Sequence, residues 1–587
     1  MKTYNLSEKL CFHADYRGTH YLGQGWSRPE KNHCWSDGYK ADITLYIREL
    51  SESDLILRVN CAAFLAGNEF ETQNIDVYAN QKLICSWKVS KKSCFEVVIN
   101  RCLIKESYLK IEFDIKNPIS PAQCGLSLDQ RLLGIDIYDL VLIEKFSDVL
   151  PTAQLIGQGH DLVGDMYKSL KGFHRAIRID SNKTFEHMLN SGIYEKISSR
   201  GLMPEHMYRK ATSTRYSYYV SALTGVFIYP SNYPLLMLRD AAKTWIAINR
   251  HLLSLSDDLP YGLSDGHYGN FVQFDNATAR WCDLGSIVNN PSSLSFGLAE
   301  FINCYVTPLF MFSLPESGEI NIRQFMSENR NGISQEAVSS FIGHNPNLNN
   351  IYNVIFQENR EIALIDLEKI IDAIDFSHHK GFWSDYRNVE ALTSAWQGDL
   401  LQNTEDSRYK AVLDLVKRSD ATTFIDIGCN DGIFSLMCVR EGLKGIAIDL
   451  DEHAINKLYS FVQQHPEIEL SIAYGGFMDV VHTADLVLAL ALTHHLVLSQ
   501  QLNFSAIAKQ LALVAERSVI TEFMPDGLGG TPQHPAPFPN PLPTEYTLEN
   551  FVGELSKYFR VVEVISYDRL KNKPWYSNRI LIYCEKS

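Results

Sequence analysis

A glycine-containing segment between residues 423 and 432 combines the residue types of a small-molecule site. An apolar run ends there in the string D-I-G-C-N-D-G, in which Asp426 precedes Gly428 by two residues and Gly432 closes the turn. Glycine tolerates left-handed backbone angles and lets a ligand approach the main chain. A dinucleotide loop would read G-x-G-x-x-G, whereas this one reads G-x-x-x-G and carries carboxylates at Asp426 and Asp431. Those carboxylates would repel a pyrophosphate, so the loop favours a cationic amino-acid cofactor.

A further acidic residue, Asp449, ends the next apolar run about 20 residues beyond this loop. A carboxylate there can accept hydrogen bonds from both hydroxyls of a ribose, and charge-assisted bonds of that kind contribute roughly 1.5–3 kcal/mol each. An acidic loop followed by an acidic strand end favours S-adenosylmethionine over NAD as the ligand. A Rossmann-like fold with an empty site is the alternative interpretation.

Three side chains at the ends of later apolar runs are candidates for catalysis. His494 and His495 follow the run ADLVLALAL, and histidine has an unperturbed pKa of about 6.5, which suits a general base acting on a hydroxyl. At most one of the two can face the acceptor; we favour His494, and the transfer rate should then rise with pH at about 6–7. The alternative is that both histidines pack against or cap the next helix. Glu522, which ends RSVITEF, would orient a histidine or bind a sugar hydroxyl, with a solvated strand end as the alternative.

The central part of the chain contains another spacing with chemical meaning. Asp265 is followed by Asn270 five residues later and by Asp283 in the triplet D-L-G, with the strand-like segments FVQF and ARWC between them. Protein and small-molecule kinases place a catalytic-loop aspartate and two magnesium ligands in this order. One carboxylate orients the hydroxyl, while the amide and the other carboxylate hold Mg²⁺ on the phosphates. The spacing therefore indicates a kinase-like C-lobe.

The other parts of a kinase are weakly represented upstream. The string GQGHDLVG at 157–164 is a poor glycine-rich phosphate loop, and the strand FHRAIRID offers Arg175 and Arg178 where a kinase would show lysine. We therefore expect a kinase-like domain without phosphoryl transfer. An active kinase and a chance recurrence of three loop residues are the alternatives.

The candidate residues of the C-terminal third must be positioned by a sheet. Residues 396–587 alternate unbroken apolar runs with helical segments, which predicts a Rossmann-like, doubly wound α/β domain. Ligands of such sheets bind beyond the carboxyl ends of the strands. The predicted strands lie in TTFID, KGIAID, ADLVLALAL, RSVITEF, RVVEVISY and RILIYCEK.

The two preceding blocks have different patterns. Residues 1–147 contain short alternating segments such as YLKIEFDIK, and NIDVYANQKLICSWKV reads as two strands around a turn near Asn80 and Gln81, so we expect an antiparallel β-sandwich. Residues 150–395 mix helices and strands in the manner of a kinase-like α+β domain, with an amphipathic helix in DAAKTWIAINRHLLSL.

The first block also contains GQGWSRPE, CWSDG and SPAQCGLSLDQRLLGI, and it resembles the small β-sandwich domains attached to some bacterial polysaccharide-assembly enzymes and glycosyltransferases. Aromatic rings can stack on sugars, so Tyr21, Trp26 and Trp35 are candidates for carbohydrate binding. The alternative is that these three rings close the end of the sandwich.

The C-terminal motifs IDIGCNDGIFS, AIDLDEHAINKLY, ADLVLALALTHHLVL and TEF resemble, in order, those of class I S-adenosylmethionine-dependent methyltransferases. The string ALALTHHL resembles the corresponding segment of a group of bacterial methyltransferases that includes nodulation-type and surface-polysaccharide proteins. SDGHYGNF, WCDLGSI and FINCYVTPL resemble the region that precedes the domain in that group, so the likeness covers roughly residues 150–587.

This resemblance implies S-adenosylmethionine as the cofactor and assigns residues to it. Asp449 would hold the ribose hydroxyls, Leu450 would flank the adenine, and Asp479 in GGFMDV would contact the adenine amine. The methionine and ribose side would be lined by Asp426, Gly428, Cys429, Asn430 and Gly432.

Composition excludes several other classes. The 587 residues carry 54 Lys and Arg against 69 Asp and Glu, a net charge of −15, which disfavours nucleic acid as the partner. The N-terminus lacks a signal-peptide core, and the apolar window Phe296–Leu314 is interrupted by Glu300, Asn303 and Pro308, which favours a buried helix over a membrane span. Twelve cysteines without a CxxC pair indicate reduced thiols and no zinc site, as in a bacterial cytoplasm.

The function that these patterns favour is O-methylation of a glycan or glycolipid intermediate of bacterial surface polysaccharide. One alternative is a bifunctional kinase–methyltransferase that caps a polysaccharide chain. The other is a non-enzymatic glycan-binding scaffold. Peripheral association with membrane polysaccharide machinery is consistent with this interpretation, while the acceptor, O- versus N-methylation and the oligomeric state stay open.

Overall fold

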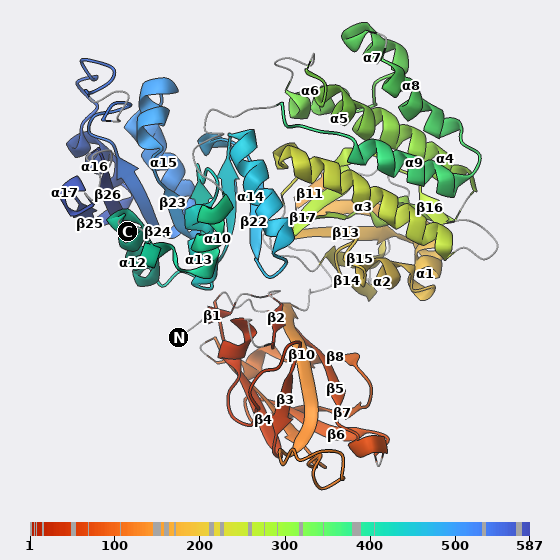
Figure 1. Cartoon of the computed structure of the whole chain (residues 1–587). Coiled ribbons are helices and arrows are strands. Elements are labelled where there is room, and N and C mark those ends of the chain that lie inside the picture. The colour runs from red at the N-terminus through yellow and green to blue at the C-terminus, as the bar shows by residue number, and fades with distance from the viewer. Residues whose placement is uncertain are drawn as a thin grey trace. The chain divides into compact units, whose positions relative to one another are not determined.

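The structure of the chain is a computed structural model (Figure 1). It describes residues 3–4, 6, 9–13, 17–48, 54–68, 70–105, 107–144, 154–157, 164–169, 172–210, 216–222, 228–255, 261–274, 276–289, 291–315, 321–343, 345–378, 389–403, 406–530, 536–570 and 578–586. The chain forms two compact units. One comprises Met1–Asn182 with His206–Gly225, and the other comprises Lys183–Glu205 with Val226–Ser587.

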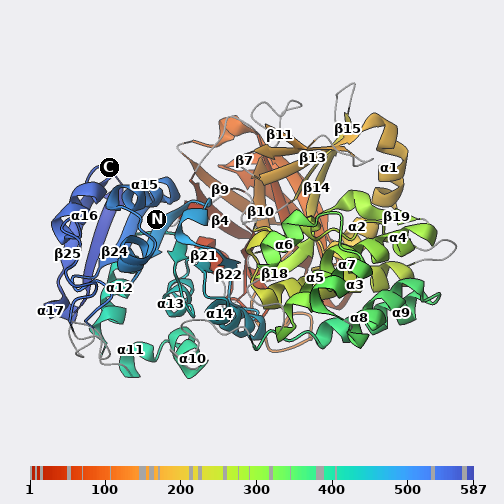
Figure 2. The same ribbon diagram turned by 90° about the horizontal axis from the view of Figure 1, so that it is seen from above.

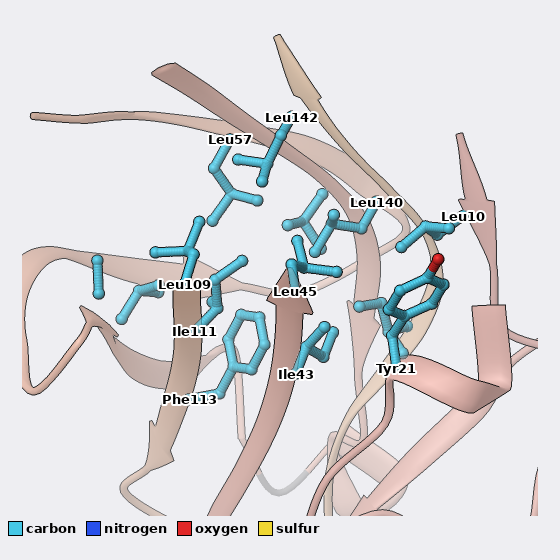
Figure 3. Packing of buried hydrophobic residues seen from close by; sticks show 14 of the residues in the cluster. Leu10, Tyr21, Ile43, Leu45, Leu57, Leu109, Ile111, Phe113, Leu140 and Leu142 are labelled. Atoms are coloured by element: carbon cyan, nitrogen blue, oxygen red, sulfur yellow. The ribbon is translucent and has the colours of Figure 1, made fainter. Parts of the chain in front are cut away.

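The first unit begins with two five-stranded sheets in the orders β1-β4-β9-β6-β7 and β2-β10-β5-β8, with β3 paired to β10. Alternate side chains of both sheets fill one core, in which Ile43, Leu57, Leu109 and Phe113 converge (Figure 3). The strands are β1 Thr3–Tyr4, β2 Leu10–Cys11, β3 Cys34–Asp37, β4 Lys40–Ile47, β5 Leu55–Ala63, β6 Gln73–Ala79, β7 Lys82–Val89, β8 Ser93–Ile99, β9 Tyr108–Ile115 and β10 Leu133–Glu144.

The turn between two strands of this region follows directly from its sequence. The predicted turn is present between β6 and β7, where Asn80 and Gln81 both have positive φ, 45° and 70°. Asparagine tolerates that region better than most residues, and the two-residue turn fixes the register of the hairpin.

The three aromatic residues proposed for sugar stacking contact the protein itself. Tyr21 is buried and its hydroxyl donates to the carbonyl of Thr3 at 2.9 Å. The Trp26 indole donates to the carbonyl of Asp42 at 2.7 Å, and the ring of Trp35 meets the edges of neighbouring aromatic rings. These contacts favour the packing interpretation for Tyr21 above all.

The first unit also contains a five-stranded antiparallel sheet in the order β11-β12-β13-β15-β14. Its strands are β11 Gln154–Gly157, β12 Gly164–Ser169, β13 Gly172–Arg178, β14 His206–Lys210 and β15 Tyr216–Ala222. Arg178 donates to the buried Asp165 at 2.5 Å, and the Tyr216 hydroxyl donates to the same carboxylate at 2.7 Å. Most of the weak glycine-rich string, residues 158–163, lies outside the described residues.

The second unit opens with a helical region around the long helix α3. The predicted amphipathic face of α3 is buried: Trp245 stacks on Phe301 with ring centroids 4.2 Å apart, and Ile248 and Leu252 are fully enclosed. Helices α3 and α9 lie side by side in both views (Figures 1 and 2). The helices are α1 Asn182–Asn190, α2 Ile193–Ser198, α3 Leu235–Ser254, α4 Pro291–Phe301, α5 Thr307–Phe312, α6 Ile322–Glu328, α7 Gln335–Ile342, α8 Pro346–Asn353 and α9 Arg360–Asp372.

Two small two-stranded antiparallel sheets complete this helical region. They pair β16 Tyr261–Leu263 with β19 Ile287–Asn289 and β17 Phe271–Phe274 with β18 Thr278–Trp281. The hairpin predicted from FVQF and ARWC is therefore confirmed. Among the described helices, one 18-residue window, Ser295–Phe312, is long and apolar enough to cross a membrane, and 67% of it is buried.

The last part of the second unit is a seven-stranded sheet in the order β22-β21-β20-β23-β24-β26-β25. Only β26 runs against its neighbours. The strands are β20 Thr423–Ile427, β21 Lys444–Asp449, β22 Leu470–Tyr474, β23 Ala484–Ala489, β24 Ala515–Phe523, β25 Phe559–Ile565 and β26 Ile580–Lys586. The accompanying helices are α10 Val389–Gln397, α11 Leu400–Asn403, α12 Ser407–Arg418, α13 Ile433–Arg440, α14 Glu452–Gln464, α15 Phe504–Val514, α16 Leu548–Leu555 and α17 Tyr567–Leu570.

All six strands predicted for this sheet are present, and the prediction of an α/β fold is confirmed. The edge strand β22 was missed, because LSIAY has neither strict alternation nor a long apolar run. The strand order reverses at β20: the chain continues through β21 and β22 on one side of it and returns to β23 on the other. Ligands bind at this point in sheets of this kind.

Candidate functional site

The loop after β20 is held against the end of β21 by main-chain hydrogen bonds. The N–H groups of Gly428 and Cys429 both donate to the carbonyl of Ile448, at 2.8 and 3.1 Å. Gly428, Asn430 and Gly432 have φ of 69°, 53° and 82°, so three residues of this short turn are left-handed. Glycine and asparagine suit that conformation, which the sequence predicted for the two glycines.

The missing side chains of the two glycines make room for leucines. A Cβ built on Gly428 would lie 2.4 Å from Leu492, and one on Gly432 would lie 2.5 Å from Leu458. The missing side chains therefore admit Leu492 and Leu458. The approach of a ligand to the main chain of this loop stays a prediction. Any residue with a Cβ would displace a leucine at either position.

The carboxylate of Asp449 clamps this loop to the next turn. Its Oδ2 accepts the N–H of Asn430 at 2.6 Å, and its Oδ1 accepts the N–H of Asp451 at 2.7 Å. Burial raises the pKa of Asp449, and these two N–H groups oppose the rise. Each carboxylate oxygen has two acceptor positions, so both oxygens retain capacity for a hydroxyl.

Asp426 is a buried carboxylate at the end of β20, directly before this loop. Its Oδ2 accepts the hydroxyl of Ser435 at 2.6 Å. Burial raises the pKa of Asp426 to about 7; the bond from Ser435 opposes this rise and the charge of Asp449 adds to it. A buried carboxylate whose pKa is raised by burial and by a second carboxylate lies in an environment that a cation would stabilise. The carboxylates of Asp426 and Asp449 therefore fit the cationic S-adenosylmethionine and do not fit a diphosphate.

The remaining residues assigned to the cofactor differ in their surroundings. Cys429 is buried, and burial raises the pKa of its thiol well above the usual value. Leu450 is 49% exposed directly beside the loop. Asp479 is exposed and its Oδ2 caps its own turn by accepting the N–H of Gly476 at 2.8 Å. Leu450 thus presents an apolar surface, while one oxygen of Asp479 is engaged locally.

The two histidines lie at the start of a short π-helix, His495–Ser499, beyond β23. Their ring centroids are 4.0 Å apart. His494 is 7% exposed, and its Nδ1 has no hydrogen-bond partner among the described residues. Burial lowers the pKa of His494 to about 2, helped by His495 and Arg579, and burial also lowers the pKa of His495. Both rings are therefore neutral at physiological pH.

Glu522 is fully buried, so its interpretation as a solvated strand end is wrong. Arg408 donates Nε to Oε1 at 2.6 Å and Nη2 to Oε2 at 2.9 Å, and Arg579 donates Nη1 to Oε2 at 2.9 Å. Burial would raise the pKa of Glu522, but the charges of the two arginines outweigh it and lower this pKa to about 2. A carboxylate held in this way is a poor proton acceptor.

Glu522 instead holds the segment that leads to the histidines. Its Oε2 accepts the N–H of Ala491 at 2.9 Å, and its carbonyl accepts the hydroxyl of Thr493 at 2.5 Å. Sequence reasoning missed Arg408 and Arg579. A signal for Arg408 existed, because it stands at helical spacing with Val412 and Leu415 on the buried face of α12.

The kinase-like residues of the central region lie in one loop cluster. Asn270 donates to Oδ2 of Asp265 at 2.9 Å, and the N–H of Cys282, next to Asp283, donates to the carbonyl of Asn270 at 2.8 Å. Asp283 also accepts the N–H of Gly285 at 3.0 Å. Glu300, which the sequence singled out only as a polar interruption, accepts the N–H of Gly266 at 2.8 Å. Burial raises its pKa, and a hydrogen bond with Asp265 raises it further.

No metal centre is evident in the part of the chain that the structure describes. Within those ranges, no group of three or more His, Cys, Asp and Glu residues is arranged to hold a metal ion.

Comparison with known proteins gives distant likenesses. No family model matches the chain. The nodulation protein NoeA of Rhizobium meliloti is 28% identical over 191 residues, which are 29% of this chain and 40% of that protein. The chain thus spans less than half the length of this curated relative.

Three solved structures of methyltransferases are similar at low identity. The N-methyltransferase NodS of Bradyrhizobium japonicum is 13% identical, with 31% of this chain and 94% of that chain covered and a TM-score of 0.24. The bifunctional kinase–methyltransferase WbdD is 19% identical, with 33% and 42% covered and a TM-score of 0.24. The magnesium protoporphyrin IX methyltransferase of Synechocystis is 13% identical, with 31% and 79% covered and a TM-score of 0.24.

Proposed function

We propose that this chain is an S-adenosylmethionine-dependent methyltransferase whose reaction is carried by residues 396–587. The observation that supports it most is the clamp at the point where the strand order reverses, in which Asp449 binds the left-handed loop through the N–H of Asn430 at 2.6 Å. This clamp presents a carboxylate where a ribose would lie in a sheet of this kind. The buried Asp426 adds a site for positive charge.

The cofactor would supply a methyl group activated by a sulfonium centre, so the protein's task is mainly positioning. Asp449 would accept the ribose hydroxyls, Asp426 would face the cationic part, and Leu450 would cover one side of the adenine. Asp479 would reach the adenine amine with the oxygen that does not cap its own turn.

On the acceptor side, His494 is the proposed proton acceptor. Its buried Nδ1 is without a hydrogen-bond partner in the described structure. Burial lowers the pKa of this ring to about 2, so His494 would accept a proton only once the bound acceptor has raised that pKa. Glu522, with Arg408 and Arg579, would hold the segment that carries this histidine.

The proposed acceptor is a glycan or glycolipid intermediate of bacterial surface polysaccharide. The motif resemblance and the likeness to a nodulation protein support this class. Residues 1–147 would act as an accessory β-sandwich, and residues 150–395 as a kinase-like domain without phosphoryl transfer. For the latter, Arg178 stands where a kinase would show lysine, and its charge is paired with the buried Asp165.

The decisive test is incubation of the full chain with methyl-labelled S-adenosylmethionine and a panel of glycans and lipid-linked sugars. Transfer of label to one of them, lost in Asp449→Ala, would support the proposal. Absence of S-adenosylmethionine binding by calorimetry would contradict it and favour the glycan-binding scaffold.

A second candidate is a bifunctional kinase–methyltransferase. The contact of 2.9 Å between Asn270 and Asp265 favours it, because it joins two residues of the kinase-like spacing. ATP turnover that is lost in Asp283→Asn would establish this second activity.

A further inference from the structure

Strand β22 is an edge strand of the seven-stranded sheet, and a side chain from the central region covers its outer edge. The amide of Gln273, in β17, donates to the carbonyl of Ile472 at 2.5 Å and accepts the N–H of the same residue at 2.6 Å. Gln273 is fully buried, and it substitutes for a neighbouring strand at the middle of β22. An open sheet edge needs such cover, so the two regions of the second unit share one interior.

Helix α3 depends on the same interface for its N-terminal cap. Its first residues follow Pro234, which supplies no side-chain cap. Instead, Oε1 of Glu452 accepts the N–H of Leu235 at 2.7 Å, and Oδ1 of Asn456 accepts the N–H of Leu236 at 3.0 Å. Both caps come from α14, the helix that follows Asp449. Helix N-termini require partners of this kind.

Arg323 links this cap to the end of β22. Its side chain is 10% exposed and donates Nη2 to Oε2 of Glu452 at 2.8 Å and Nε to the carbonyl of Tyr233 at 3.2 Å. The guanidinium also lies 3.6 Å from the centre of the Tyr474 ring. A planar cation that pairs, donates and stacks at once fixes its neighbours in three directions.

The residue after Tyr474 begins the turn that borders the proposed adenosine site. Asn232 donates to the carbonyl of Tyr474 at 3.1 Å. The next N–H, of Gly475, donates to the carbonyl of Asp449 at 3.0 Å, and the following one, of Gly476, donates to Asp479 at 2.8 Å. The turn therefore connects residues assigned to the ribose and the adenine with anchors that lie in the central region.

We propose that Arg323 and Asn232 are positioning residues of the cofactor site, so that the central region forms part of the site and does not merely precede it. This inference rests on the proposed function. Neither residue would touch the cofactor; both would act by holding Tyr474 and thereby the turn of residues 474–476. Displacement of that turn would move the backbone beside Asp449 and weaken binding of the adenosine.

The test measures S-adenosylmethionine affinity by calorimetry on the full chain, with Arg323→Ala, Asn232→Ala and Tyr459→Phe. Tyr459 donates to Asp240 at 3.0 Å in the same interface, so its variant is a control that removes one bond away from the turn. We expect the dissociation constant to rise on the order of 3- to 30-fold in the first two variants, the range seen for indirect coupling, and to stay unchanged in the control. Arg323→Lys should recover part of the affinity because it keeps the charge that pairs with Glu452.

Amide hydrogen exchange at residues 475 and 476 provides a second readout. Exchange should accelerate in Arg323→Ala and Asn232→Ala and remain at the wild-type rate in Tyr459→Phe. Wild-type affinity in both positioning variants would overturn the inference, as would an equal loss in the control. If Arg323→Ala fails to fold, Asn232→Ala, which removes one hydrogen bond, decides the question. Failure of the wild-type chain to bind S-adenosylmethionine would instead overturn the proposed function.

Discussion

The N–H of Asn430 donates to Oδ2 of Asp449 at 2.6 Å, so the carboxylate that ends β21 also fastens the left-handed loop after β20. The same carboxylate accepts the N–H that follows its own strand, from Asp451. One side chain thus defines the relative position of two turns at the mouth of the sheet. The proposed ribose site and the structure of the loop cannot be altered independently.

Asp449→Ala should weaken S-adenosylmethionine binding by about 2–4 kcal/mol, because it removes the acceptor for two ribose hydroxyls. Calorimetry on the wild type and the variant measures the loss. Asp420→Ala removes the same charge from an exposed position and should leave the affinity unchanged. Equal affinities of the wild type and Asp449→Ala for S-adenosylmethionine would contradict the assignment of the ribose to Asp449.

Cofactor binding should release a proton from Asp426. The pKa of Asp426 is raised to about 7 in the structure, and a cation bound nearby would stabilise the ionised form. Affinity should therefore increase as the pH rises from about 6 to 7 and level off above the raised pKa. Calorimetry in buffers of different ionisation enthalpy measures the protons released. Asp426→Asn should release none, and proton release that persists in this variant would assign it to another group.

Replacement of the proposed base should lower turnover by about 10²–10⁴-fold in His494→Ala, with cofactor affinity nearly unchanged. Burial lowers the pKa of His494 to about 2, so this ring stays neutral from pH 5 to pH 8. The rate should then show no inflection at about 6–7 from this histidine, contrary to the expectation from an unperturbed side chain. Wild-type turnover in both His494→Ala and His495→Ala would show that neither is the base.

Glu522→Gln should destabilise the fold by about 3–5 kcal/mol, because it leaves two buried arginines without their shared anion. Its pKa is lowered to about 2, below the unfolded value of about 4.3. The stabilisation is thus complete above about pH 4.3 and is lost as the pH falls toward 2. Denaturant unfolding measures the difference. Glu516→Gln, on the exposed start of the same strand, should change stability by less than about 0.5 kcal/mol.

The full chain should show neither ATP hydrolysis nor phosphoryl transfer from its central region. Of the two arginines of β13 that stand where a kinase would show lysine, Arg178 has its charge paired with Asp165. An assay with labelled ATP and a glycan panel measures this. Phosphoryl transfer that disappears in Asp265→Asn would prove the expectation wrong and would favour the bifunctional enzyme.

Local sequence pattern determined much of the C-terminal sheet. Six of its strands, the left-handed loop and the acidic ends at Asp426 and Asp449 were predictable. Apolar runs, glycine and strand-terminal charges act over a few residues, so a single sequence displays them. The edge strand β22 has no clear local pattern, and the partner of its outer edge, Gln273, lies 199 residues away in the chain.

Only the tertiary structure decided what the candidate residues can do. The sequence could not tell an exposed Glu522 from a buried one, and Arg408, its main partner, is 114 residues away. The same holds for His494, whose lowered pKa comes from burial, and for Arg323, which reaches Glu452 over 129 residues. Burial and ion pairing depend on which distant side chains meet in space. Residue type and spacing therefore located the site, while packing determined the protonation state and contacts of each group in it.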